Sequence, residues 1–331
     1  MKKIITIALA ATALAACTKE NTLQTADKVA ITFENAFVDN ATKATDLTTA
    51  NITSFGVYAS VKNTDGDQGL ILTNEPVTGN KADGYNYANT QYWVPNATYS
   101  FVAIAPYTDA EWEYTPATET KGVNAYNGTI AFDNVSAAAN QDVIFASHQR
   151  SMPSTINSVT PVNLTFNHIL SRVRLTFINA IAPNANISLQ ISDVKITNAY
   201  EKGTLAVAEG RVASSTWTVS NKTLNVPFAN ANTILAGDES ESTEHHYFIP
   251  ANTTYNVMFK VTIYQAGVKL GTYDRTASVN VNMLQGTSYD IKASLTKDNA
   301  LPNALQPITF TVETVNDWTS WTDVTGTVPG V

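Results

Sequence analysis

Apolar and polar residues alternate along several stretches of this chain, and this alternation is the strongest constraint on its fold. In residues 171–178, Val173, Leu175 and Phe177 fall on one side of an extended chain, opposite arginine and threonine side chains. Residues 257–264 repeat the pattern with valine, phenylalanine and isoleucine. Since successive side chains of a β-strand point to opposite faces, a period of two predicts half-buried strands. Similar alternation marks three further segments: residues 99–105, 142–146 and 187–192.

Short turn signals separate the predicted strands, and nothing beyond the first 16 residues has the long apolar stripe of a helix. Glycine favours tight turns because it adopts positive φ without steric cost. The glycine-containing turn pairs are Asp65-Gly66, Asp83-Gly84, Asn127-Gly128, Lys202-Gly203 and Ala266-Gly267. Many short strands separated in this way predict an all-β fold, an antiparallel β-sandwich.

The first 17 residues have the features of a bacterial lipoprotein leader. Lys2 and Lys3 precede an apolar segment, residues 4–16, that is too short to span a membrane. Leu14-Ala15-Ala16-Cys17 resembles a lipobox, in which the cysteine becomes the acylated first residue, and Cys17 is the only cysteine of the chain. We therefore expect residues 1–16 to be a lipoprotein signal peptide and residues 17–27 a lipidated linker. An ordinary signal peptide with a chance cysteine is the alternative.

Length and charge limit the organisation and the partners of the mature chain. Without its 16-residue leader the 331-residue chain keeps 315 residues, enough for two domains of ordinary size. The strand patterns predict an N-terminal sandwich at residues 28–168, with a first strand at 28–37 and a polar link at 38–50, and a C-terminal sandwich at 169–331. Loss of Lys2 and Lys3 leaves 18 basic against 28 acidic residues, which argues against a nucleic acid partner.

The sequence carries no motif of a familiar catalytic or metal site: GxSxG, a phosphate-binding glycine loop, HExxH and CxxC are all absent. His245 and His246 are adjacent, and a strand would point them to opposite faces, which is poor geometry for one metal ion. Glu111, Glu113 and Glu119 lie close in sequence, yet nothing places two of them across a cleft as a glycosidase requires. We expect no enzyme activity, no metal and no cofactor, with a hydrolase as an alternative.

Several aromatic residues suit a different function, the binding of sugars. Sugar-binding sandwiches stack pyranose rings on tryptophan and tyrosine, but large aromatic side chains also fill cores and cover sheet edges. The candidate pairs are Tyr92 with Trp93, Trp112 with Tyr114, and Trp318 with Trp321.

The order of short motifs along the chain resembles the fimbrillin family of Bacteroidetes, the type V pilin subunits. The lipobox is followed by a strand that ends in phenylalanine, a "TKAT" link, a "FGVYA" strand, "NQDVIFA", "FNHILS" and a terminal "VNDW". These motifs begin at Val29, Thr42, Phe55, Asn140, Phe166 and Val315. The resemblance covers essentially the whole mature chain.

The resemblance implies two tandem transthyretin-like antiparallel β-sandwich domains with Greek-key-type connections, exported as an outer-membrane lipoprotein. In polymerising members of the family, a trypsin-like protease cuts the link behind the first strand. Removal of that strand opens a groove, which the C-terminal strand of the next subunit fills. A sandwich that lacks one strand leaves an unpaired ladder and an apolar trench, and an added strand satisfies both.

The first strand and its link fit this scheme. Val29, Ile31 and Phe33 share one face and form the candidate displaced strand. Lys43 is the only basic residue of the link, so the expected processing site lies between Lys43 and Ala44. Relatives often carry arginine at this position, so a lysine-specific or broadly tryptic protease would cut here and an arginine-specific one would not.

The segment that would be donated is less sharply defined. Ile308, Phe310 and Val312 alternate in the same rhythm and form the candidate donor strand within a tail at residues 307–331. They could instead be a permanent strand of the second domain. The donor would then be the tail beyond residue 318, through Val324 and Val328.

The expected function is therefore that of a structural subunit or an accessory protein, at the anchor or tip, of a fimbria. The protein would be exported as a lipoprotein, exposed at the cell outer membrane, and assembled with other fimbrial subunits by protease-triggered donor-strand exchange, serving adhesion. The alternative is a monomeric surface lipoprotein that binds glycan or host protein through exposed aromatic side chains.

Overall fold

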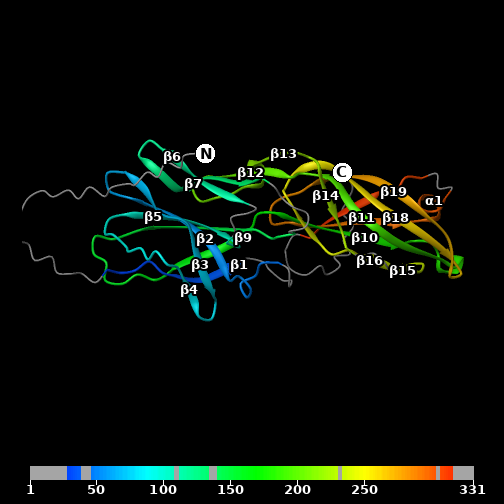
Figure 1. Cartoon of the computed structure of the whole chain (residues 1–331), viewed down its shortest axis with the longest axis horizontal. Helices are drawn as coiled ribbons and strands as arrows, with labels where there is room; N and C mark the ends of the chain where they lie inside the picture. Colours follow the sequence, from blue (N-terminus) through cyan, green and yellow to red (C-terminus); the bar gives the residue numbers. More distant parts are fainter. Residues whose placement is uncertain are drawn as a thin grey trace, which may run out of the picture.

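The computed structural model describes residues 28–38, 46–107, 112–133, 140–229, 233–302 and 306–315 of the protein. Within these residues the chain is almost entirely β-structure, which confirms the all-β expectation. The molecule is elongated, with the strands from β1 to β9 at one end and most of the later strands at the other (Figure 1). We call these two parts the N-terminal half and the C-terminal half. None of the described residues forms a helix long and apolar enough to cross a membrane.

The elements follow one another in a simple order. The strands of the N-terminal half are β1 (Phe33–Val38), β2 (Ser54–Lys62), β3 (Gln68–Asn80), β4 (Gly84–Asn86), β5 (Thr98–Ala105), β6 (Glu113–Glu119), β7 (Gly122–Phe132), β8 (Ile144–Ser151) and β9 (Val162–His168). The next elements are β10 (Ser171–Asn179), η1 (Pro183–Ala185), β11 (Ile187–Ala199), β12 (Lys202–Val207), η2 (Ser214–Thr216), β13 (Trp217–Ser220), β14 (Leu224–Pro227) and β15 (Ile234–Leu235). The chain continues with β16 (Ser240–Ser242), β17 (His246–Phe248), β18 (Asn252–Gln265), β19 (Val268–Asn282), β20 (Ser288–Leu295), α1 (Lys297–Ala300) and β21 (Phe310–Val315).

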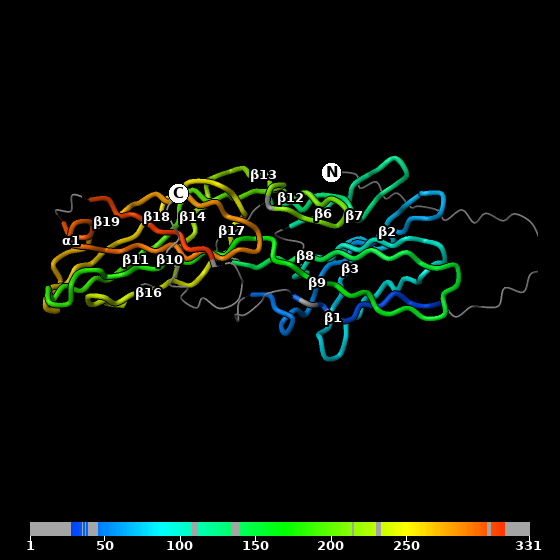
Figure 2. Tube along the Cα trace, turned by 180° about the vertical axis from the view of Figure 1, so that it is seen from behind, coloured from blue at the N-terminus to red at the C-terminus, as the bar shows by residue number. Residues whose placement is uncertain are grey.

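The N-terminal half is a sheet that folds back on itself. Its strands run in the order β3-β2-β5-β8-β9-β1-β4, and β4 pairs in turn with β3. The enclosed space is filled by alternate side chains of these strands, among them Phe55, Phe101 and Phe166, each fully buried. β1 lies beside β9 (Figure 2) and also pairs with β4, so the first strand is part of the wall around this core.

The C-terminal half is a sandwich of two sheets. One sheet has the order β16-β10-β20-β21, with β17 also paired to β10, and the other has the order β14-β11-β18-β19, with β15 paired to β11. Val173, Leu175 and Phe177 face the shared core, together with Val257 and Phe259 of β18. The alternation in the sequence therefore placed the correct side chains inside.

The two halves share a strand plan, and it includes two parallel pairs within otherwise mainly antiparallel sheets. β1 is parallel to β9, and β10 is parallel to β20. The series β2-β5-β8 in the first half corresponds to β11-β18-β19 in the second. In each half, the first strand therefore lies beside a strand from near the end of that half.

The junction between the halves is packed. β10 begins soon after residue 168, but β12 and β13 return to the N-terminal half, where β12 pairs with β7. A separate buried cluster joins the halves and includes Ile130 of β7, Leu205 of β12 and Tyr247 of β17. One hairpin of the later sequence, β12 and β13, therefore extends the earlier sheet.

Two of the predicted turns are wrong. Lys202-Gly203 forms the start of β12, where both residues pair with β13. Asn127-Gly128 lies inside β7, and Gly128 pairs with Pro116 of β6 and Val207 of β12. A Cβ atom at Gly128 would come within 2.4 Å of the Thr115 carbonyl oxygen, so this glycine permits a close approach of strands and forms no turn. Ala266-Gly267, in contrast, forms the β18–β19 hairpin turn with φ of 48° and 80°.

Candidate functional site

Residues 28–38 fill a long apolar groove in the core of the N-terminal half, and we call this groove the seat. Ile31 and Phe33 are at most 2% exposed, Ala36 is 2% exposed and Val38 is 9% exposed. Val29 is half-buried and packs against the same core. The three residues predicted from the sequence therefore do share one inward face, and the burial continues beyond them to the end of β1.

Phe33 is the deepest aromatic contact of this segment. Its ring lies 5.4 Å from the ring of Tyr87, 6.0 Å from that of Phe101 and 6.2 Å from that of Phe55, all in edge-to-face geometry. Burial of one such side chain contributes roughly 1.5–3 kcal/mol, and aromatic pairs of this geometry add to it. Loss of the segment would therefore open a hole lined by aromatic rings.

Backbone hydrogen bonds hold the segment along its length. Before β1 begins, the amide of Ile31 donates to the carbonyl of Gln91 at 2.8 Å, and the amide of Trp93 donates to the carbonyl of Val29 at 3.0 Å. The amide of Val162 donates to the carbonyl of Thr32 at 2.8 Å, where the parallel pairing with β9 starts. The seat thus offers both an apolar trench and unpaired backbone groups to any strand that occupies it.

The candidate donor residues already belong to the C-terminal half of their own chain. β21 pairs antiparallel with the edge of β20, and Ile308 just before it is 7% exposed within the core. Phe310 lies 6.3 Å, ring to ring, from both Phe177 and Phe259. Lys292 of β20 and Glu313 form an ion pair of 2.7 Å. Ile308, Phe310 and Val312 therefore pack in the C-terminal half of their own chain in this structure.

The lipidation and processing residues lie outside the described part of the chain: Cys17, Lys43, Ala44, and the tail residues Trp318, Trp321, Val324 and Val328. The two ends of the link are described, however. The amide of Val38, at the end of β1, donates to the hydroxyl of Thr49 at 2.9 Å. Val38 and Thr49 are therefore neighbours in the described fold.

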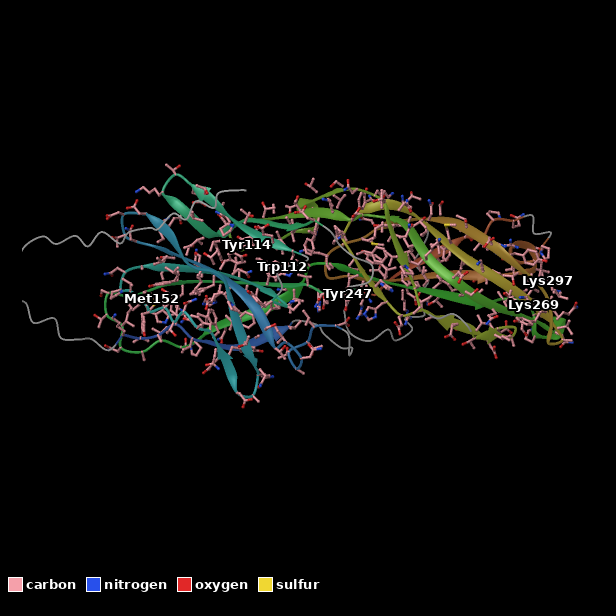
Figure 3. The ribbon with its side chains drawn as sticks, viewed as in Figure 1. Trp112, Tyr114, Met152, Tyr247, Lys269 and Lys297 are labelled. Carbon is pink, nitrogen blue, oxygen red and sulfur yellow. The ribbon has the colours of Figure 1, made fainter. Side chains whose placement is uncertain are left out.

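A buried ionic cluster in the C-terminal part of the link, at Asp46, was not predicted from the sequence. Asp46 is fully buried and pairs with the fully buried guanidinium of Arg172. The hydroxyl of Tyr247 donates to the same carboxylate at 2.5 Å, and His245 Nε2 lies 3.3 Å from it. Figure 3 shows Tyr247 between the two halves of the molecule.

The charge state of Asp46 follows from these contacts. Burial alone would raise the pKa of its carboxyl group, but hydrogen bonds from His245 and Tyr247 and the charge of Arg172 outweigh burial. The pKa of Asp46 is therefore held below its ordinary value of 3.8, and the group is an anion at neutral pH. Burial raises the pKa of Tyr247, so its phenol stays protonated and can donate.

The aromatic candidates for sugar stacking are mostly inside the protein. Trp93 is 6% exposed, Trp112 4% and Tyr114 2%, whereas Tyr92 is 44% exposed. Figure 3 places Trp112 and Tyr114 within the N-terminal half. The described residues therefore supply single exposed rings rather than a row of them, which disfavours a stacking platform at these positions.

The described residues were also compared with what a metal site or a sugar-binding cavity requires. No group of three or more potential metal ligands occurs within the described residues. His246 packs its ring against Phe228 while His245 faces Asp46, so the adjacent pair does point in different directions. A cavity of about 530 Å³ lies beside β8 and β9, and its polar lining includes Thr165, Asn167 and Arg211 but no exposed tryptophan or tyrosine of the described chain.

Comparisons with known proteins identify a family and similar solved structures for this chain. The family model for fimbrillin-like proteins matches residues 42–318. A fimbrial protein from Bacteroides vulgatus has a similar solved structure, with a TM-score of 0.58 at 16% identity over 88% of this chain and 99% of the other. A candidate cell adhesion protein from Bacteroides ovatus has a TM-score of 0.52 at 15% identity over 88% and 98%. At such low identity the similarity shows a common fold. No curated protein sequence matches the chain.

Proposed function

Because the chain belongs to the fimbrillin-like family, we propose that it is a subunit of a surface fimbria that assembles by exchange of its first strand. The family and the fold support the broader assignment to adhesion-related fimbrial proteins. The observation that carries the finer proposal is the seat of residues 28–38. A short segment fills a trench in the core, and a link with a single basic residue, Lys43, separates it from the rest of the chain.

Assembly would begin with hydrolysis of the peptide bond between Lys43 and Ala44 by an external trypsin-like protease. The segment that ends at Lys43 is then held only by noncovalent contacts, and it can be displaced. Its departure uncovers the edge of β9 and the aromatic rings around Phe33. A strand from another subunit would restore the backbone hydrogen bonds and fill the trench with alternate side chains.

We propose that the donated strand is the tail beyond residue 315. β21 supports this choice because Ile308, Phe310 and Val312 already pack in the C-terminal half of their own chain. Withdrawal of β21 would expose that core and break the Lys292–Glu313 pair. The tail carries Val324 and Val328, and its use would cost none of the described contacts.

The proposed location is the outer surface of the cell. The leader and Cys17 support export as a lipoprotein, and acyl chains buried in the bilayer would hold the unprocessed subunit at the outer membrane, at about 0.8 kcal/mol for each buried CH₂ group. A cut after Lys43 would separate the assembled subunit from this anchor. The proposed partners are other fimbrial subunits, of the same or a homologous chain, and a host protein or glycan as the target of adhesion.

Limited digestion of the mature protein with a trypsin-like protease tests the proposal. We expect a cut between Lys43 and Ala44, identified by mass spectrometry, and a ladder of oligomers on electrophoresis. Lys43→Gln is expected to remain uncut in the link and monomeric, while the control Lys62→Gln, at the exposed last residue of β2, assembles like the wild type. A protein that stays intact at Lys43 and monomeric would refute assembly by strand exchange.

A monomeric surface adhesin is the second candidate. Tyr92 and Val94, which are 44% and 53% exposed, give it some support as neighbouring exposed side chains. The burial of Trp93 and Trp112 removes two of the tryptophans that this function would use. Binding of glycans by the uncut monomer, lost on Tyr92→Ala, would favour it.

A further inference from the structure

Asp46 lies in the C-terminal part of the 38–50 link and is the first residue described after Lys43, and each of its three oxygen atoms has a partner. Its carboxylate forms an ion pair with Arg172, accepts a hydrogen bond from Tyr247 and lies beside His245. Its backbone carbonyl accepts a hydrogen bond of 2.8 Å from the side-chain amide of Asn51. A side chain so fully enclosed fixes the position of the chain at this point.

The residues that follow are fixed as well. The amide of Leu47 donates to the carboxylate of Asp142 at 2.9 Å, and Asp142 in turn pairs with His168 Nδ1 at 2.9 Å. The amides of Asn51 and Ile52 both donate to the carbonyl of Thr48, which closes a turn. Ile52 is 1% exposed, and β2 begins two residues later. The chain from Asp46 to β2 is therefore continuously anchored.

The anchor reaches across the molecule. Arg172 belongs to β10 and Tyr247 to β17, so the carboxylate of Asp46 ties the start of the retained chain to the C-terminal half. The side chain of Asn140 reinforces this junction, because it accepts from the amide of Tyr247 and donates to the carbonyl of His245. β1, in contrast, pairs with β9 and β4 of the N-terminal half.

We propose that Asp46 is a positioning residue that fixes the boundary between the removable segment and the permanent fold. The cluster of Asp46 with Arg172, Tyr247 and His245 holds the new end of the chain after a cut in the link. β1 then leaves while the junction of the two halves stays closed. The role of the cut rests on the proposed function, whereas the anchoring contacts stand without it.

The electrostatics of the cluster explain why the boundary should be sharp. A buried carboxylate and a buried guanidinium stabilise each other, and removal of one leaves the other charged and unpaired in a nonpolar place. Fraying of the chain past Asp46 would have a similar effect, since Arg172 would lose this buried carboxylate while it keeps the neutral hydroxyl of Ser288. Fraying of residues before Asp46 carries no such penalty. Local opening should therefore stop at this residue.

Digestion with a broad-specificity protease, which needs no particular residue in the link, tests the inference. The mature protein with Cys17→Ser is digested, and the N-terminus of the resistant core is read by mass spectrometry. We expect the wild-type core to begin at residues 44–46. In Asp46→Ala the N-terminus of the resistant core should recede toward Ile52. The protease should trim it at least about tenfold faster than in the wild type, because proteolysis follows the population of the open form.

Two further variants keep the test decisive. The double variant Asp46→Asn with Arg172→Gln removes both charges and so leaves no buried ion without its counterion. It replaces Asp46→Ala if that variant does not fold, and its core should also recede. Asp193→Ala removes an exposed aspartate paired with Lys260 and should recede no faster than the wild type. An Asp46 variant whose core starts at the wild-type residue would overturn the inference. Receding ends in a protein that never forms ladders would instead retain the anchor and refute the assembly proposal.

Discussion

Each half of the molecule has its first strand parallel to a strand from near its end, yet the two first strands are held very differently. β1 pairs with β9 at five positions and with β4 at one, and its register shifts after Glu34. β10 pairs with β20 at eight consecutive positions, and β16 and β17 pair along its other side. Both strands nevertheless contribute fully buried aromatic side chains, Phe33 and Phe177.

The difference shows what a removable strand requires. Side chains of β1 are needed to complete the core, but few backbone contacts hold it, and the Asp46 cluster anchors the chain behind it. β10 has the opposite character, because it carries Arg172 of that cluster and pairs with β20 at eight positions, with β16 and β17 along its other edge. Under the proposed assembly, one strand plan would give a replaceable first strand in one half and a permanent one in the other.

The largest expected effect is on the free energy of unfolding, when either of the two buried phenylalanines is replaced by alanine. Phe177→Ala should lower the free energy of unfolding by about 3–5 kcal/mol both before and after assembly, since β10 stays in place. Phe33→Ala should cost a similar amount, about 3–5 kcal/mol, in the intact subunit only. Denaturant unfolding of intact protein and of purified oligomers measures both. Oligomers weakened equally by the two substitutions would show that β1 never leaves.

The next effect in size is a loss of folding stability at low pH, caused by His246 beside β10. Burial, aided by the charge of His245, lowers the pKa of His246 from 6.5 to about 4, and His246 sits opposite Val173 of β10. The unfolded chain therefore binds this proton first as the pH falls, so stability is lost from about pH 6.5 and the loss is complete below about pH 4.

Because His246 is partly accessible to solvent, we expect this loss to be about 1–2 kcal/mol. Thermal unfolding of the wild type and of His246→Phe, measured between pH 7 and pH 4, checks it. The variant should lose less stability over this range by that amount. Equal pH profiles would mean that His246 is protonated in the folded protein at its ordinary pKa.

The smallest effect concerns the edge strand β21. Glu313→Gln removes the ion pair with Lys292, both partly exposed, and should reduce stability by less than about 1 kcal/mol. The amides of β21 should remain protected from hydrogen exchange in monomers and oligomers alike, because we assign donation to the later tail. Loss of protection in β21 on assembly would identify Ile308, Phe310 and Val312 as the donor after all.

The sequence predicted those features that depend on neighbouring residues. The inward faces of residues 29–33 and of β10 follow from local alternation, and the hairpin at Ala266-Gly267 follows from its glycine. The turn predicted at Gly128 was wrong because the same residue type also allows strands to approach closely. A glycine alone does not distinguish the two uses.

Features built from distant residues were not predictable in this way. Asp46 and Arg172 are 126 residues apart, and neither stands out from its neighbours in sequence. Period-two patterns are also the same for parallel and antiparallel strands, so the pairing of β1 with β9 left no local signal. Both depend on the way the two halves fold together.

A pair of engineered disulfides tests the central claim, that β1 alone must leave its seat, most directly. With Cys17 replaced by serine, Glu34→Cys with Asn163→Cys would lock β1 to β9, since these residues are exposed partners in register. Ile178→Cys with Ser294→Cys would lock β10 to β20 in the same way. After the cut at Lys43, the β1 lock should abolish oligomer ladders until a reductant is added, and the β10 lock should leave them unchanged. Ladders that form with β1 locked and oxidised would contradict the account.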